Sequence, residues 1–209
     1  MTHGSPLRIK ICGITSLDDA LAAAGSGADA LGFVFYGKSP RYVDPEKAGE
    51  IIGRLPPLVT TVGVFVDEPA DRVNEIIKTA RLDAAQLHGD ETPEECLRVE
   101  ARVIKALRVR GPEVIERMAG YDVAAFLLDA FREDAPGGTG ETFDWAIAAR
   151  AAGRGRVILS GGLTPDNVAG AARKVRPYGV DVSSGVELAP GRKDHERVRR
   201  FIEEARAAL

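Results

Sequence analysis

Short apolar runs alternate with amphipathic segments along the whole chain. The runs with the length and composition of strands cover residues 8–12, 29–35, 60–66, 84–87, 103–109, 123–129, 156–160 and 180–183. Most are apolar at consecutive positions, which is typical of parallel strands covered by helices on one face and packed on the other. The pattern therefore predicts a buried parallel sheet with a helix after each strand.

Signals for helix starts fall between these runs. Ser16 precedes an alanine-rich segment, and three further segments begin with a capping residue and a proline, at Asp44-Pro45, Thr92-Pro93 and Thr164-Pro165. The last segment predicts a helix whose apolar residues recur at helical spacing, namely Val198, Phe201, Ile202, Ala205 and Leu209. Strands and helices thus alternate without a linker or a change in composition.

Eight strand–helix units predict a single-domain α/β fold, the (β/α)8 barrel, over residues 7–209. Such barrels usually have about 250 residues, with about 200 at the short end, so a chain of 209 residues fits. The alternative is a doubly wound open sheet, which typically has about five or six strands and would leave units over. Residues 1–6 are expected to form a flexible N-terminal extension.

The charge balance and the cysteines narrow the function classes. The 28 Lys and Arg are interleaved with 31 Asp and Glu, for a net charge of −3, which does not favour nucleic acid as a partner. The two cysteines lie in unrelated contexts, which fits a reducing cytoplasm better than a disulfide framework. No apolar stretch approaches the ~20 residues of a membrane span. We therefore expect a cytoplasmic protein without a nucleic-acid or membrane partner. Proteins of the fold predicted above occur as monomers or dimers, so the sequence leaves a monomer or a homodimer open.

Barrel enzymes carry their sites where the strands end, and the first strand ends in Cys12-Gly13. A free cysteine is most often a small buried hydrophobe, and position alone favours that reading. A thiol at a strand end next to a glycine turn can instead face a site and act as a thiolate. The three histidines form no metal-type cluster, so no metal is predicted.

The last two strands end in glycine-containing loops. Gly161 and Gly162 follow the seventh strand, and Ser183, Ser184 and Gly185 follow the eighth. Glycines let the backbone approach a ligand closely, and exposed amides at a helix start bind anions. Loops seven and eight are the frequent phosphate position of this fold, so we expect a phosphate site here and not two ordinary turns. The glycines of residues 137–140 suggest either a flap or a flexible loop.

Three more strand ends carry candidate chemistry. Asp129 ends a strongly apolar strand, where desolvation would raise the pKa of its carboxyl and suit a general acid; a capping or loop role is the alternative. Arg41 follows Ser39-Pro40, so a fixed turn could aim it at a carboxylate, although a surface role is equally open. His88 ends the fourth strand, where a lone histidine is more often a hydrogen-bonding residue than a ligand. An acid and a base facing one phosphosugar suggest a proton-transfer isomerisation.

Alternation along the first strand predicts a buried ion pair. Lys10 and Cys12 share one face of that strand, and Asp181 and Ser183 share one face of the eighth. The first and eighth strands are neighbours in a closed barrel. We therefore expect Lys10 and Asp181 to pair below the site, either as plain charge compensation or to bias the thiol.

These residues resemble the phosphoribosylanthranilate isomerase family of tryptophan biosynthesis. The resemblance spans nearly the whole chain in order, at residues 10–15, 39–43, 62–66, 86–91, 127–129, 137–140, 160–163, 180–187 and 190–194. It implies a small barrel without cofactor or metal. It also implies an Amadori rearrangement of N-(5-phosphoribosyl)anthranilate to 1-(o-carboxyphenylamino)-1-deoxyribulose 5-phosphate.

The resemblance assigns a role to most of the candidates. Asp129 would protonate the ring oxygen as general acid, and Cys12 would remove the C2 proton as general base. Apart from the resemblance, the position of Lys10 on the same strand face suggests that its charge helps to lower the pKa of the Cys12 thiol. Arg41 would hold the anthranilate carboxylate, and the loops at Gly161, Gly162, Ser183, Ser184 and Gly185 would hold the phosphate. His88 and Asp181 are further candidates for substrate binding, from their positions in the barrel and not from the resemblance.

Two other functions stay open on the sequence. A related phosphosugar aminoaldose isomerase would share the fold, but it would place an aspartate where Cys12 stands. A catalytically silent barrel that binds a phosphorylated metabolite would need neither Cys12 nor Asp129.

Overall fold

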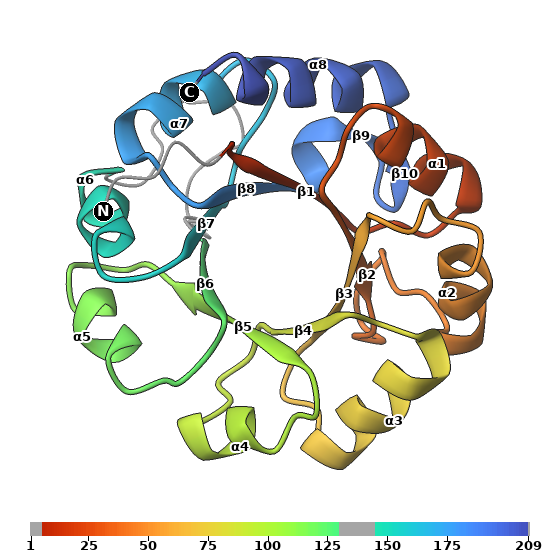
Figure 1. The fold of residues 1–209 in the computed structure, drawn as a ribbon, viewed down its shortest axis with the longest axis horizontal. Coiled ribbons are helices and arrows are strands. Elements are labelled where there is room, and N and C mark those ends of the chain that lie inside the picture. Colours follow the sequence, from red (N-terminus) through yellow and green to blue (C-terminus); the bar gives the residue numbers. More distant parts are fainter. Residues whose placement is uncertain (1–5, 130–144, 209) are drawn as a thin grey trace.

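Parallel strands close into a barrel in the computed structural model, which describes residues 6–129 and 145–208. The barrel strands follow one another in chain order, and β8 pairs with β1 to close the ring (Figure 1). They are β1 (Arg8–Cys12), β2 (Ala30–Val34), β3 (Thr60–Phe65), β4 (Ala84–Leu87), β5 (Arg102–Arg108), β6 (Ala125–Asp129), β7 (Val157–Ser160) and β8 (Gly179–Val182). The predicted (β/α)8 barrel is confirmed, and the doubly wound open sheet is wrong.

Helices form a ring outside the strands (Figure 1). They are α1 (Leu17–Gly25), α2 (Pro45–Ile52), α3 (Ala70–Ala80), α4 (Pro93–Leu97), α5 (Val114–Met118), α6 (Trp145–Ala152), α7 (Val168–Val175) and α8 (His195–Arg206). A short 3-10 helix η1 (Ser184–Val186) and a hairpin of β9 (Glu187–Ala189) and β10 (Arg192–Lys193) stand between β8 and α8. No helix in the described parts of the chain has the length and apolar character needed to cross a membrane.

Three of the four helix starts predicted from capping residues are confirmed. The Ser16 hydroxyl accepts the N–H of Asp19, the Asp44 carboxylate caps α2, and Thr92 forms a reciprocal capping box at α4. The start predicted at Thr164-Pro165 is wrong, because α7 begins at Val168. The side chain of Asn167 accepts the N–H of Thr164 and donates to the carbonyl of Gly162, and these two bonds hold the segment as a turn.

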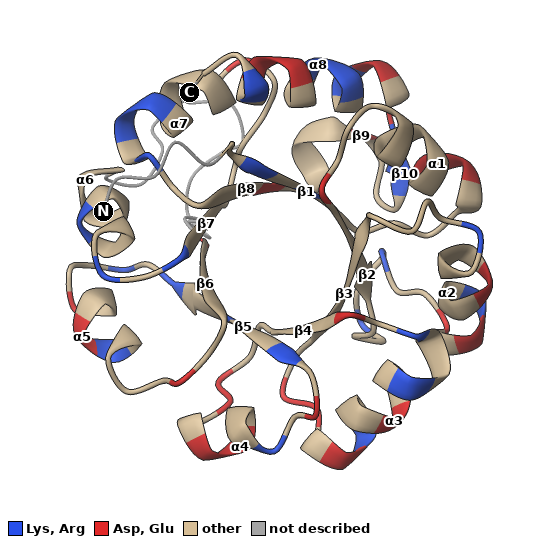
Figure 2. Cartoon of the chain, in the orientation of Figure 1, with Lys and Arg blue, Asp and Glu red and all other residues tan. Residues whose placement is uncertain are grey.

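The strands alternate between two apolar layers. Ile9 and Ile11 lie in the larger core between the barrel and its helices, while a smaller cluster fills the barrel itself with Val62, Ala84, Ile104, Ala106, Ala125, Leu127 and Ile158. Figure 2 shows that acidic and basic residues are interleaved on the outer helices, most clearly on α8. The charges of the chain therefore face mainly outward, and a charged residue inside the barrel needs a specific explanation.

The last helix is bound from outside to the segments that precede β1 and β2. Arg206 at the end of α8 donates from Nη1 to the carbonyl of Leu7 over 2.5 Å and from Nη2 to the Asp29 carboxylate over 2.6 Å. Asp29 also accepts the N–H of Ile9 over 2.9 Å. The start of the barrel and its last helix are thus fastened together. Residues 1–5 of the predicted extension and the glycines of residues 137–140 lie outside the described residues.

Candidate active site

Polar side chains on the inward faces of the strands meet where the strands end. Cys12, Asp129 and Ser160 are the last residues of β1, β6 and β7, and His88 directly follows β4. In the strand register, Asp129 lies opposite both Ser160 and Arg108. This end of the barrel therefore carries a thiol, a carboxyl, an imidazole and a hydroxyl above an apolar interior.

The predicted pair of Lys10 and Asp181 is confirmed inside the barrel. Lys10 Nζ donates to Asp181 Oδ1 over 2.6 Å, and both side chains are almost fully buried. The second oxygen of Asp181 accepts from the Ser160 hydroxyl over 3.0 Å. Burial would lower the pKa of Lys10, but the Asp181 carboxylate and the Cys12 thiol outweigh it, so this pKa lies above its ordinary value. The pair is therefore a charged one, held directly below Cys12.

Gly32 on β2 makes room for this arrangement. A Cβ atom at this position would lie 2.7 Å from the Cys12 sulfur and 3.1 Å from Lys10 Nζ. The thiol and the amine thus both stand against the bare backbone of the neighbouring strand. Sequence reasoning missed this residue, although a glycine inside an apolar strand is a visible signal of a close approach.

Burial sets the acidity of the Cys12 thiol. It raises the pKa of the thiol above its ordinary value; Asp181 acts in the same direction, while Lys10 and Lys193 act against it. Lys10 lowers this pKa, as expected, but burial outweighs its effect and the thiol pKa lies above its ordinary value. The reason is that Cys12 is 7% exposed, so desolvation of the thiolate is the largest effect.

His88 and Asp129 face each other across the same end of the barrel. His88 Nε2 lies 3.2 Å from Asp129 Oδ2, and the Asp129 side chain keeps 21% of its surface exposed. The carboxyl is thus less desolvated than its apolar strand suggested. Gln86, on the inward face of β4, places its Nε2 2.9 Å from His88 Nδ1. Sequence reasoning missed Gln86, whose signal is a polar residue within an apolar strand.

The loops after β7 and β8 pack directly on each other. Gly161 and Gly162 have positive φ angles of 85° and 70°, which other residues rarely adopt. A Cβ atom on Gly185 would lie 2.0 Å from the carbonyl oxygen of Leu163, so only glycine fits there. The Ser183 hydroxyl is buried and has no hydrogen-bond partner among the described residues. A buried hydroxyl without a partner is suited to a ligand atom.

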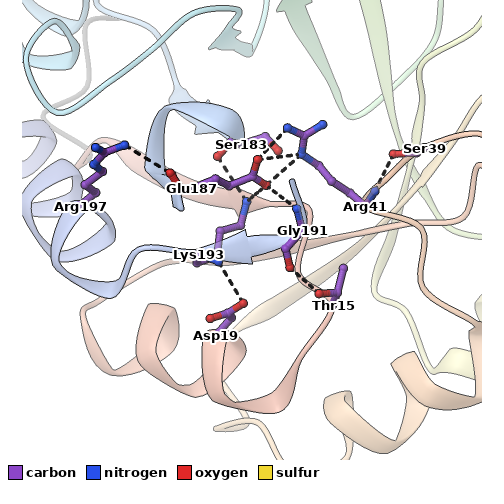
Figure 3. A network of polar contacts seen from close by, with 9 residues as sticks. All are labelled: Thr15, Asp19, Ser39, Arg41, Ser183, Glu187, Gly191, Lys193 and Arg197. Carbon is purple, nitrogen blue, oxygen red and sulfur yellow. Dashed lines mark hydrogen bonds and ion pairs between the residues drawn. The ribbon is translucent and has the colours of Figure 1, made fainter. Parts of the chain in front are cut away.

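Arg41 reaches the same loops and binds Glu187. The Ser39 hydroxyl accepts the Arg41 N–H, as expected of a turn that aims the side chain. Arg41 Nε and Nη2 donate to the Glu187 carboxylate over 2.9 and 2.7 Å. Figure 3 shows this carboxylate between Arg41 and Lys193, whose Nζ binds Glu187 over 2.8 Å.

The network around Glu187 joins several loops at this end of the barrel. Lys193 Nζ also donates to the carbonyl of Ser183, and its backbone N–H donates to Asp19 in α1 (Figure 3). The Thr15 hydroxyl donates to the carbonyl of Gly191 over 2.6 Å. The β9–β10 hairpin therefore fixes the loop after β1, Arg41 and the loop after β8 relative to one another. Sequence reasoning assigned Glu187 and Lys193 no part in this.

Comparisons with known proteins agree over nearly the whole chain. A family model described as N-(5'phosphoribosyl)anthranilate (PRA) isomerase matches residues 9–204. The N-(5'-phosphoribosyl)anthranilate isomerase of Geobacter sp. (strain M21) is 59% identical over 199 residues, which cover 95% of this chain and 98% of the relative. The crystal structure of phosphoribosyl anthranilate isomerase from Thermotoga maritima has a TM-score of 0.89 at 46% identity, over 96% of this chain and 99% of the other.

A second solved structure holds a ligand. It is a phosphoribosyl anthranilate isomerase in complex with reduced 1-(o-carboxyphenylamino)-1-deoxyribulose 5-phosphate, with a TM-score of 0.87 and 46% identity. The match covers 96% of this chain and 99% of that one.

Proposed function

The chain belongs to the N-(5'-phosphoribosyl)anthranilate isomerase family, and from this premise we propose which of its side chains carry out the reaction. The enzyme catalyses the Amadori rearrangement of N-(5-phosphoribosyl)anthranilate to 1-(o-carboxyphenylamino)-1-deoxyribulose 5-phosphate in tryptophan biosynthesis. Family membership favours this activity over the related aminoaldose isomerase and over the silent binding barrel. The observation that carries the assignment is that a thiol above an ion pair and a carboxyl beside a histidine face one barrel end.

Asp129 is the general acid of the first step. Its carboxyl gives a proton to the furanose ring oxygen, the bond from that oxygen to C1 breaks, and the anthranilate nitrogen lone pair forms the Schiff base. His88 Nε2, 3.2 Å from Asp129 Oδ2, supports the carboxylate that is left behind.

Cys12 is the general base of the second step. Its thiolate takes the proton from C2, the electrons of that C–H bond form the C1–C2 double bond, and the iminium electrons return to nitrogen. The enolamine then tautomerises to the ketone. Because burial raises the pKa of the thiol, only a minor thiolate fraction carries this step at neutral pH. The Lys10 ammonium below Cys12 stabilises that thiolate.

The substrate phosphate binds between the loops after β7 and β8. Gly161 and Gly162 expose their backbone, Ser184 and Gly185 begin η1, and the buried Ser183 hydroxyl lacks any other partner among the described residues. Asp181 supports this side of the site from below through Ser160 and Lys10.

Arg41 binds the anthranilate carboxylate. Its Nε and Nη2 are held by Glu187, so the guanidinium is fixed in direction. Nη1 binds no other residue in the described part of the chain and serves the substrate. A partly exposed Arg41 over a buried Glu187 fits a side chain that serves a ligand at the mouth of the barrel.

We further propose that the enzyme works in the cytoplasm; its state as a monomer or a homodimer stays a prediction.

Loss of substrate fluorescence during turnover tests the two assigned roles. Cys12→Ala and Asp129→Asn should each lower kcat by about 100-fold or more, the usual contribution of a positioned acid or base. Cys96→Ala, in α4, and Asp122→Asn, before β6, are the matched controls and should keep near-wild-type kcat. A Cys12 or Asp129 variant with near-wild-type kcat and an intact fold would overturn the assignment.

A further inference from the structure

Burying the polar side chain of Gln86 inside the barrel costs free energy of folding. It is the only glutamine in the chain, it is 1% exposed, and its apolar neighbours on the inner strand faces include Ala84 and Ile104. Its Oε1 is buried and has no hydrogen-bond partner among the described residues. A methionine or leucine would fill the same space without an unpaired carbonyl. The fold therefore does not account for this glutamine.

The hydrogen bond of Gln86 determines which nitrogen of His88 carries a proton. Gln86 Nε2 can only donate, and it lies 2.9 Å from His88 Nδ1, so this nitrogen accepts. A neutral imidazole whose Nδ1 accepts has its hydrogen on Nε2. That N–H faces Asp129 Oδ2 at 3.2 Å and donates to it.

This donor restricts where the proton of Asp129 can sit. Because Oδ2 accepts from His88, a proton on the carboxyl has to be carried by Oδ1. In the opposite tautomer, the bare Nε2 would accept the carboxylic proton on Oδ2 and hold it towards the histidine.

We propose that Gln86 is a positioning residue: it selects the Nε2–H tautomer of His88, which keeps the transferable proton of Asp129 on Oδ1. Gln86 touches neither the substrate nor the transferred proton and acts only through His88. The proposal rests on Asp129 being the general acid.

A first experiment reads the tautomer directly. In a His3→Gln/His195→Gln background, His88 is the only histidine, and a long-range proton–nitrogen correlation spectrum of 15N-histidine-labelled protein reports its ring nitrogens. We expect protonation at Nε2 alone in this background, and a proton on Nδ1 after Gln86→Glu, because a carboxylate can only accept. Protonation of Nδ1 before the Gln86 change would overturn the proposal.

A second experiment measures turnover and stability of Gln86→Met. We expect kcat to fall about 10- to 100-fold, as when other orienting partners are lost, with KM within about twofold and a midpoint of thermal unfolding no lower than wild type. A purely structural role predicts the opposite, lower stability with unchanged kcat, and that result would overturn the proposal. The two proposals fail in different experiments. If Asp129 is not the general acid, Asp129→Asn stays active. If Gln86 does not select the tautomer, the spectrum of His88 shows it, whatever the activity of Asp129→Asn.

Discussion

At Cys12, burial and the neighbouring lysines act on the pKa of the thiol in opposite directions. Burial and Asp181 raise its pKa, and the Lys10 ammonium lowers it. The raised pKa favours the neutral thiol, and the positive charge of Lys10 stabilises the thiolate that acts as the base. The activity of the enzyme should therefore follow changes in the charges below the thiol.

Removing the charge of Lys10 and removing the charge of Asp181 should shift the pKa of the Cys12 thiol in opposite directions. Lys10→Met removes a lowering influence, so the thiol pKa and the acid limb of kcat/KM should move to higher pH. Asp181→Asn removes a raising influence, so both should move to lower pH. Thiolate absorbance during pH titration, in a Cys96→Ala background, measures the first quantity and an activity profile the second. Shifts in the same direction would contradict the proposed influence of charge.

The placement of these residues could be predicted from the sequence, but the acidity of the thiol could not. Alternation along β1 and the closure of the barrel are enough to bring Lys10 to Asp181. The depth of Cys12 depends on Gly32 of the neighbouring strand, whose missing side chain lets the sulfur and Lys10 Nζ pack against bare backbone. The residues next to Cys12 in the sequence do not show which residue of the neighbouring strand will face its sulfur, so this contact could not be predicted.

At the scale of elements, the β9–β10 hairpin is the part that periodicity could not reveal. Its strands, Glu187–Ala189 and Arg192–Lys193, are too short for alternation to show. The hairpin is held in place by Glu187, which is buried between Arg41 and Lys193. The barrel strands and the starts of the capped helices, by contrast, carry local signals, and each predicted strand end lies within about two residues of the observed one.

Glu187 should make the stability of the protein depend on pH in the acid range. Although burial would raise its pKa, hydrogen bonds from Arg41 and Lys193 hold it below the ordinary value. A lowered carboxyl pKa stabilises the fold above the unfolded pKa of about 4.3, and this stabilisation is lost as pH falls through the folded pKa. Glu187→Gln should therefore cost about 3 kcal/mol at pH 7, mainly by leaving the buried Lys193 ammonium without its carboxylate. The loss should be smaller as the pH falls below about 4.

Urea unfolding of wild type and Glu187→Gln at neutral and acid pH measures this difference. Glu196→Gln is the matched control, because Glu196 pairs with Arg199 on the exposed face of α8 and should change the unfolding free energy very little. An equal loss of stability at both pH values would show that Glu187 does not act through its charge.

At the scale of the whole molecule, the count of eight strand–helix units was enough to choose the barrel over the open sheet. A closed barrel takes up all eight predicted strands, whereas an open sheet of about five or six does not. The same closure makes one pairing unlike the others. β2, β3 and β4 pair with neighbours in the sequence, whereas β1 pairs with β8, and Arg206 binds the carbonyl of Leu7 from 199 positions away.

The seam between β1 and β8 therefore has a kinetic consequence. Closing so long a loop costs more chain entropy than any pairing of consecutive strands, so the seam should form after the folding transition state. Arg206→Ala should then speed unfolding with little effect on the folding rate, whereas Val64→Ala, between β2 and β4, should slow folding. Folding and unfolding rates measured against denaturant concentration test this, and a slower folding limb for Arg206→Ala would contradict it. The bonds from α8 to the segments before β1 and β2 would thus act as a latch on the finished barrel, setting how long the enzyme stays folded and not how fast it folds.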